Sequence, residues 1–184
     1  MSCVHNDSMI ESRGLIESVE KAKDAVEKIG GTFKSNYRFK DVIFVPQRNN
    51  CNLNDDVVRV RVYVKSDWPT KKVVVVRKQA TFMGTLKKDH VVLKEAFDSE
   101  KEAFDFVQHH IQEFQYGFEY AREGWEYSLG DCRIFIEDIE GYQPSMEVEA
   151  NDEKNIRDLF RKIGVNTMMK ESVPEIMRRR LKLR

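Results

Sequence analysis

Cysteine is scarce in this sequence of 184 residues and forms no pattern that holds a metal or a disulfide framework. Cys3, Cys51 and Cys132 are odd in number, widely separated and outside any Cys-x-x-Cys spacing. These features argue against a disulfide-rich secreted domain and against a zinc site. Such cysteine usage is typical of a protein from a reducing cytoplasm.

Long apolar runs are absent as well. The N-terminal residues lack the basic segment and the apolar segment of a signal peptide, and no apolar run approaches the length of a membrane span. We therefore expect a cytoplasmic protein with no membrane partner.

The chain has no net charge, because 31 Lys and Arg residues cancel 31 Asp and Glu residues. It therefore has no long-range field that would attract nucleic acid, and we expect no nucleic-acid partner. We interpret the basic segment 177–184 as a solvated or capping helix. Charged residues nevertheless make up 34% of the chain, so any site for a polyanion must be local.

The length suits one sizeable core, and no linker interrupts the sequence, so we expect a single domain over residues 1–184. Apolar residues at three- and four-residue steps predict helices over residues 15–29 and 152–162. A capping-box spacing of Ser and Glu begins a further predicted helix over residues 98–117. A short basic helix is predicted after Pro174.

Most of the remaining chain predicts antiparallel β-structure. Strands are predicted over residues 42–45, 57–64, 72–78, 90–96, 118–127, 133–139 and 146–150. Because alternate side chains of a strand face opposite sides, Arg59 and Arg61 share one face, opposite a row of valines. Glu147 and Glu149 share a face of their own strand in the same way.

Two interpretations of these charged faces remain open. In an ordinary antiparallel sheet, the apolar face covers the core and the charged face meets water. In a closed sheet, the charged faces line a cavity and the apolar faces lie beneath helices. Two like charges about 6 Å apart repel by roughly 3 kcal/mol at an effective dielectric constant of about 20, so gathered arginines need anions nearby.

The two kinds of charge suit one kind of site. Arginine donors match phosphate oxygens in pairs, so two arginines on one strand face can clamp a phosphate. Convergent carboxylates suit Mg²⁺ or Mn²⁺, hard ions that bind oxygen and commonly bridge to a substrate phosphate. Basic and acidic arrays together indicate a site for a metal and a polyphosphate.

Several segments occur in an order that resembles a known family. IEDIEGYQPSMEVE, residues 136–149, is similar to an acidic strand, a turn and a closing Glu-x-Glu strand. Upstream lie DVIFVP at 41–46, VVRVRVY at 57–63 and VVRK at 75–78, and KESVPEIM follows at 170–177. This order resembles the CYTH family, the triphosphate tunnel metalloenzymes that include class IV adenylyl cyclases and thiamine triphosphatases.

The resemblance implies an α+β fold: a closed or nearly closed antiparallel β-barrel with a charged interior and with helices packed outside. It implies phosphate-binding roles for Arg13, Arg59, Arg61, Lys78 and Arg122. It implies a site for Mg²⁺ or Mn²⁺ at Glu11, Glu137, Glu147 and Glu149. It assigns no residue to the chemical step itself.

Some positions depart from the family pattern. Met9-Ile10-Glu11-Ser12-Arg13 stands where the family reads Glu-x-Glu-x-Lys, and Lys94 stands near a position expected to be acidic. Glu137 stands where aspartate is commoner. Fewer ligands would weaken the binding or the positioning of a metal.

Two hypotheses about function follow, together with a third that needs no ligand. The first is an enzyme that uses a metal to hydrolyse a triphosphate-containing substrate or to cyclise ATP. The second is a module that binds a nucleotide or polyphosphate without turnover. Under either hypothesis we expect a ligand such as ATP and a monomer or homodimer. The third is an ordinary α+β interaction domain whose charged sheet is solvated.

Overall fold

The computed structural model describes residues 9–47, 52–66 and 73–181, so Cys3, Cys51 and the predicted strand start at Lys72 lie outside the described residues. The strands are β1 (Ile10–Leu15), β2 (Thr32–Pro46), β3 (Asp56–Ser66), β4 (Val73–Met83), β5 (Leu86–Phe97), β6 (Phe114–Leu129), β7 (Cys132–Ile139), β8 (Ser145–Ala150) and β9 (Thr167–Met168). The helices are α1 (Val19–Lys28), α2 (Glu100–His110), α3 (Glu153–Ile163) and α4 (Val173–Arg180).

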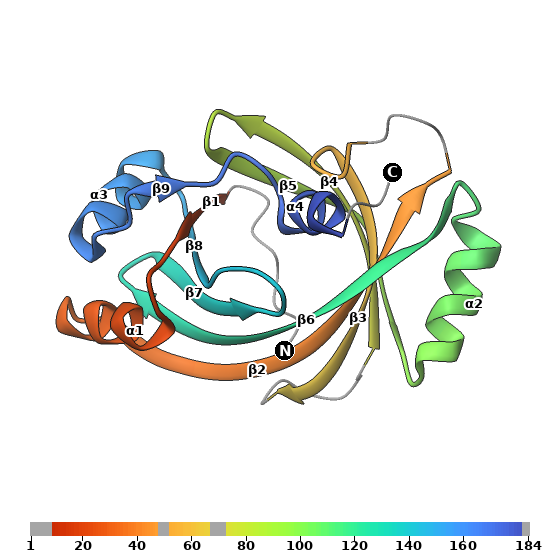
Figure 1. Ribbon diagram of the computed structural model, residues 1–184, viewed down its shortest axis with the longest axis horizontal. Helices are drawn as coiled ribbons and strands as arrows, with labels where there is room; N and C mark the ends of the chain where they lie inside the picture. Colours follow the sequence, from red (N-terminus) through yellow and green to blue (C-terminus); the bar gives the residue numbers. More distant parts are fainter. Residues whose placement is uncertain (1–8, 48–51, 67–72, 182–184) are drawn as a thin grey trace.

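The described strands form one antiparallel sheet that closes into a ring (Figure 1). Its order is β5-β4-β3-β2-β6-β7-β8-β1-β9, and β5 pairs in addition with β1. One edge of β1 therefore serves two neighbours, with Glu11 opposite Lys87 of β5 and Gly14 opposite Met168 of β9. The predicted α+β fold with a closed or nearly closed antiparallel sheet is confirmed.

Each helix begins at a side chain that accepts a hydrogen bond from the first turn. Ser18, Ser99, Asp152 and Ser172 cap α1, α2, α3 and α4 in this way. The helix α3 ends at Gly164, whose φ of 82° is a left-handed conformation that suits glycine. The predicted helix at 152–162 and the predicted helix after Pro174 are thus present.

Two predicted helix ranges are wrong at one end. Residues 10–15 form β1, so the first helix starts at Val19 rather than at residue 15. The second helix ends at His110, because Phe114 already pairs with Pro46 at the start of β6. In both places strand pairing overrides a local spacing of apolar residues that also suits a helix.

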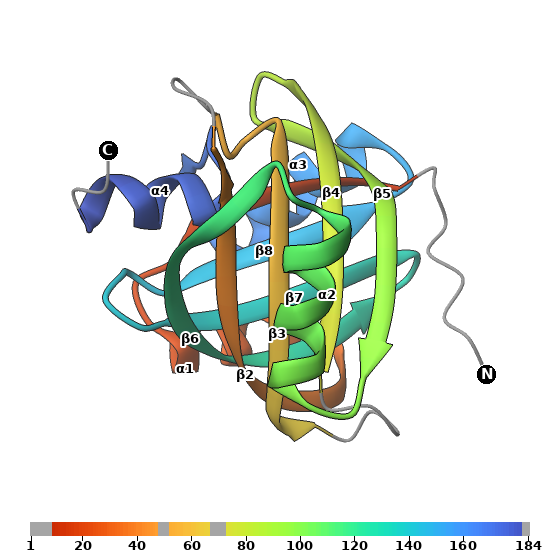
Figure 2. The same cartoon turned by 90° about the vertical axis from the view of Figure 1, so that its right-hand side faces the viewer.

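The apolar faces of the strands point out of the ring and are covered by helices. Valines of β3 and β4, among them Val60 and Val75, pack with Ala103 and Val107 of α2. Figure 2 shows α2 lying across β3 and β4 on the outside of the ring. The helices α1 and α3 cover the outer faces of β7 and β8 in the same manner.

One helix does not follow the expectation that helices pack outside. Val173 and Met177 of α4 pack against Ile43, Phe118 and Ile139, which extend inward-facing rows of their strands. Accordingly, Figure 1 shows α4 within the outline of the ring. The basic final helix therefore places an apolar side against one part of the interior, in agreement with its interpretation as a capping helix.

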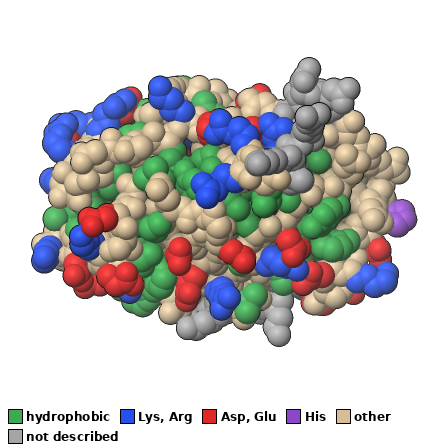
Figure 3. Space-filling view, in the orientation of Figure 1, with side chains coloured by type: hydrophobic (Ala, Val, Ile, Leu, Met, Phe, Trp, Pro, Cys, Tyr) green, Lys and Arg blue, Asp and Glu red, His purple; other side chains and the backbone are tan. Residues whose placement is uncertain are grey.

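The molecular surface carries both signs of charge. Lys and Arg side chains occur together with Asp and Glu side chains on the face shown in Figure 3, with other atoms between them. None of the described helices combines the length and the apolarity that crossing a membrane would require.

Gly124 of β6 makes room for a buried tyrosine. A Cβ atom at this position would lie 2.3 Å from Cζ of Tyr37, which is 3% exposed. We expect Gly124→Ala to lower the free energy of unfolding by about 1–3 kcal/mol through overpacking. Urea unfolding measures this cost. In a Tyr37→Leu background the same change should cost less, since the clash is removed, and an equal cost in both backgrounds would contradict the explanation.

Candidate anion and metal site

A buried aspartate lies at the centre of a group of arginines inside the ring. Asp41 of β2 is completely buried. Its Oδ1 accepts a hydrogen bond from Nε of Arg61 at 2.8 Å, and its Oδ2 accepts bonds from Nη2 of Arg61 at 2.9 Å and of Arg122 at 2.8 Å. Nη1 of Arg59 lies 3.6 Å from the same Oδ2. Strands β2, β3 and β6 thus meet at one carboxylate.

The charges of this group stabilise one another. Burial opposes ionisation of Asp41, but Arg61, Arg59 and Arg122 outweigh it and hold the pKa of this carboxyl well below its usual range. The same carboxylate raises the pKa of Arg61 against the effect of burial. Asp41 is therefore the anion that gathered arginines require.

Glu137 of β7 forms a second centre beside the first. Its Oε2 accepts hydrogen bonds from Nη1 of Arg13 at 2.7 Å and Nη1 of Arg122 at 3.0 Å, and its Oε1 accepts one from the hydroxyl of Tyr37 at 2.7 Å. Burial opposes ionisation here too, yet the two arginines lower the pKa of Glu137 to about 2. Because Arg122 contacts both Asp41 and Glu137, the two centres form one network.

Arg13 connects this network to the carboxylates of β1 and β8. Its Nη2 donates to Oε2 of Glu147 at 2.6 Å while its Nη1 holds Glu137. Oε1 of Glu11 accepts a bond from Nζ of Lys87 at 2.9 Å, and Oε2 of Glu149 accepts one from Nη1 of Arg133 at 2.8 Å. Each of these carboxylates is therefore held by one cation.

Glu11, Glu147 and Glu149 form a group that suits a divalent metal. One oxygen from each lies within 4.8 Å of the other two. In each of these carboxylates, one oxygen accepts the hydrogen bond from the cation and the other accepts none from the described residues. Each side chain is 15–19% exposed, so water and small ions can reach the group. An all-oxygen donor set of this kind fits Mg²⁺ or Mn²⁺.

Lysines complete the wall beside this group. Nζ of Lys78 on β4 lies 2.6 Å from Oδ2 of Asp89, and Nζ of Lys87 lies 2.6 Å from its Oδ1. The two lysines outweigh the effect of burial and lower the pKa of Asp89 to about 2. Lys78 therefore lies on the inside of the ring, as predicted, with a carboxylate partner.

Comparison with solved structures identifies the fold. The PH1012 protein from Pyrococcus horikoshii matches with a TM-score of 0.72 at 17% identity, over 89% of this chain and 96% of that protein. A protein from Vibrio parahaemolyticus proposed to be an adenylate cyclase matches with a TM-score of 0.68 at 11% identity, over 92% and 97%. The HpAC1 protein from Hippeastrum, whose dominant activity is that of a triphosphatase, matches with a TM-score of 0.64 at 13% identity, over 95% and 96%.

The chain has the CYTH fold. The resemblance seen in the order of its motifs is confirmed at the level of the fold by these structures. No family model and no curated protein matches the sequence itself. At such low identities the likeness shows the fold alone, so the roles of individual residues must be argued from their own geometry.

The predicted site residues of this CYTH fold all face the inside of the ring. Arg13, Arg59, Arg61 and Arg122 surround Asp41 and Glu137, Lys78 adjoins Asp89, and Glu11, Glu147 and Glu149 form the carboxylate group. Glu137 stands apart from that group, because the two arginines and Tyr37 hold it. Which of these residues bind phosphate or metal stays a prediction.

Sequence reasoning missed several residues that the structure brings to the same place. Asp41 and Tyr37 lie on β2, of which only residues 42–45 were predicted as strand. Lys87 and Asp89 lie on the first half of β5, ahead of the predicted strand at 90–96. The signal that could have found Asp41 is the electrostatic need of Arg59 and Arg61 for an anion.

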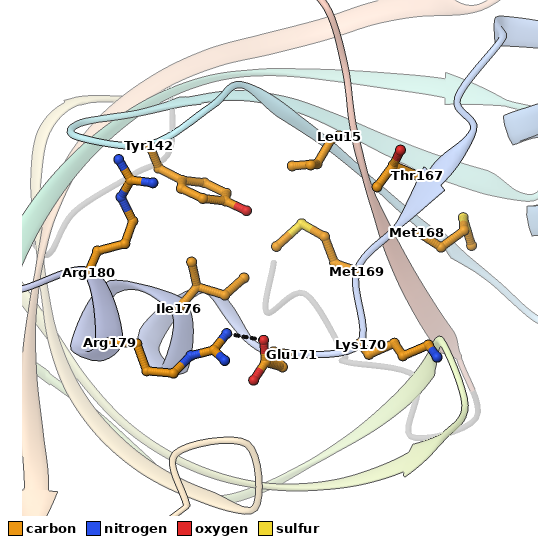
Figure 4. Close-up of a pocket in the computed structure, with 10 residues that line it drawn as sticks. All are labelled: Leu15, Tyr142, Thr167, Met168, Met169, Lys170, Glu171, Ile176, Arg179 and Arg180. Carbon is orange, nitrogen blue, oxygen red and sulfur yellow. Dashed lines mark hydrogen bonds and ion pairs between the residues drawn. The ribbon is translucent and has the colours of Figure 1, made fainter.

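Two pockets adjoin α4. One, of about 500 Å³, is lined by Met169, Ile176 and Arg179 among others, and none of the predicted site residues lines it (Figure 4). The other, of about 800 Å³, is lined in part by Phe39 and Tyr120, which also contact Arg61 and Arg122. Only the second pocket therefore adjoins the arginine network.

The lowered pKa values of Asp89 and Glu137 predict a loss of stability in acid. Both are about 2 in the folded chain, against about 3.9 and 4.3 for unfolded Asp and Glu, so their stabilisation is present above about pH 5 and is lost as pH falls towards 2. Thermal unfolding between pH 6 and pH 2 measures this. Asp89→Asn should flatten the profile, whereas the exposed Asp138→Asn should leave it unchanged.

The raised pKa of Glu149 predicts the opposite dependence of stability on pH, in a higher pH range. Burial and the neighbouring Glu147 raise its pKa to about 7, so the stability it contributes is lost as pH rises from about 4.3 through 7. In metal-free buffer, Glu149→Gln should therefore become more stable relative to the unmodified protein as pH rises from 5 to 8. A stability difference that is constant over this range would contradict the assignment.

Proposed function

We propose that the chain binds a triphosphate-containing ligand inside the ring and processes it with a divalent metal, as a phosphohydrolase or as an adenylyl cyclase. The observation that carries this proposal is the convergence of arginines and lysines with a separate group of three carboxylates on the inner face of a closed sheet. On a solvated outer sheet face, cations and carboxylates need not converge, because water solvates each of them separately.

The two parts of the site have different tasks. Glu11, Glu147 and Glu149 would hold Mg²⁺ or Mn²⁺. When bound, the ion would polarise a phosphoryl oxygen. The cations on β1, β3, β4 and β6 would bind and orient the phosphates and would stabilise charge that develops on their oxygens. The nucleophile is water in a triphosphatase and a ribose hydroxyl in a cyclase.

A second candidate function is binding of a nucleotide or polyphosphate without turnover. It is favoured by the mutual pairing of the inward charges, since Arg13, Arg61 and Arg122 already hold carboxylates of the chain. Met9 in place of a carboxylate favours it as well. In this case the ring would retain a ligand and not transform it.

One experiment separates these functions. The purified protein is incubated with ATP, inorganic triphosphate or thiamine triphosphate, with Mg²⁺ or Mn²⁺, while products and the thermal midpoint are followed. A ligand at 100 times its Kd should stabilise the folded state by about 2.7 kcal/mol. Turnover that is lost in Glu147→Ala supports the enzyme, and stabilisation without turnover supports the binding module. If the protein shows neither turnover nor stabilisation, both candidate functions are overturned.

Metal binding can be tested without substrate. We expect Glu147→Gln to weaken Mn²⁺ binding by about tenfold or more, because one of three charged ligands is lost. Titration of the protein with Mn²⁺, followed by electron paramagnetic resonance, measures free and bound ion. Asp138→Asn, an exposed carboxylate on the strand that carries Glu137, is the matched control. Equal affinities of the two variants for Mn²⁺ would show that the ion does not bind at the proposed site.

A further inference from the structure

Arg59 differs from the other arginines around Asp41. It makes no hydrogen bond with the described residues, and its single ion pair is the contact of 3.6 Å to Asp41. Its Nε is buried and has no hydrogen-bond partner, which is also true of Nε of Arg122, but both Nη groups of Arg122 donate to neighbours. The side chain is only 17% exposed, and a largely buried guanidinium with unused donors is costly unless an anion accepts from it. Arg59 therefore has donor capacity that the chain itself does not use.

Arg61 and Arg122 are already engaged. Arg61 donates two hydrogen bonds to Asp41, and its guanidinium lies 3.5 Å from the ring centre of Phe39. Arg122 donates to Asp41, to Glu137 and to the hydroxyl of Tyr120. Fixed contacts on two or more sides hold both guanidinium groups in one orientation.

Charge balance points the same way. Three arginines face the single carboxylate of Asp41, and of these only Arg122 has Glu137 as a second anion. The hydrogen bonds to Asp41 go to Arg61 and Arg122, so the uncompensated positive charge remains nearest to Arg59. Burial and the neighbouring Arg61 also lower the pKa of Arg59, an effect that a bound anion would reverse.

We infer that Asp41 is a positioning residue that holds Arg61 and Arg122, so that Arg59 is the arginine of this group that receives an anionic phosphoryl group. The inference rests on the proposed function, because it names which cation of that site meets the ligand. It divides the arginines, all predicted alike to bind phosphate, into one that contacts the ligand and two that shape its surroundings.

Variants of single arginines test this division. Binding of inorganic triphosphate is measured by calorimetry, and the thermal midpoint is measured without ligand. Arg59→Gln should weaken binding by about tenfold or more and should not lower the midpoint. Arg61→Gln should lower the midpoint, because it leaves Asp41 short of a partner, and should weaken binding less than Arg59→Gln does. Arg77→Gln, on the outer face of β4, is the control for a lost cation.

A double-mutant cycle tests the positioning role of Asp41. In Asp41→Asn, Arg61 and Arg122 lose their shared anchor and can turn to the anion, so Arg59→Gln should then weaken binding by about threefold or less. A residue that merely supports the fold would leave the effect of Arg59→Gln unchanged. If Asp41→Asn does not fold, the comparison of Arg59→Gln with Arg61→Gln decides.

The outcomes separate this inference from the proposed function. If the unmodified protein binds triphosphate and Arg59→Gln binds it equally well, the inference is wrong while the proposed function stands. An equal loss of affinity in Arg61→Gln and Arg59→Gln, with unchanged midpoints, also overturns it. If the unmodified protein binds no triphosphate with or without Mg²⁺, the proposed function and the inference fail together.

Discussion

Ion pairing within a closed sheet is the constraint on which this structure depends. Asp41 and Glu137 are almost completely buried, and each is held by arginines from other strands, with Arg122 shared between them. Removing one partner of such a pair typically costs about 3–5 kcal/mol, because the other charge stays buried alone. The strands must therefore keep one register, in which each inward charge meets its partner.

This constraint explains why the sheet is inverted relative to an ordinary one. Since the inner face is ionic, the apolar faces must be covered from outside, and α1, α2 and α3 do so. Only α4 turns apolar side chains towards the interior, where Ile43 and Ile139 continue the strands that carry Asp41 and Glu137. The interior thus has an ionic part and an apolar part, and α4 covers the latter.

Much of this arrangement can be predicted from the sequence. The alternation of Arg59 and Arg61 with valines, and of Glu147 and Glu149 with apolar residues, indicates which side chains share a face, and the structure places them inside the ring. Alternation alone cannot say whether that face is inside or outside. The order of motifs favours the inside, and the ion pairs that join different strands within the ring confirm it.

The partners of these charges could not be predicted, because they come from distant parts of the chain. Asp41 is separated from Arg122 by 81 positions, and Arg13 from Glu137 by 124. Local patterns also gave wrong boundaries: Leu15 has the spacing of a helix with Val19 but belongs to β1. Pairing between strands determines such positions, and a short window of sequence does not contain it.

The ring closes at a narrow seam between β1 and β5. Glu11 opposite Lys87 is the described register pair there, supported by their ion pair and by the hydrogen bond from Oγ of Ser12 to the carbonyl of Thr85. Glu11 also belongs to the carboxylate group. The residue that pairs β1 with β5 is thus also a member of the proposed metal group, so an ion bound there would contact a side chain that helps to close the ring.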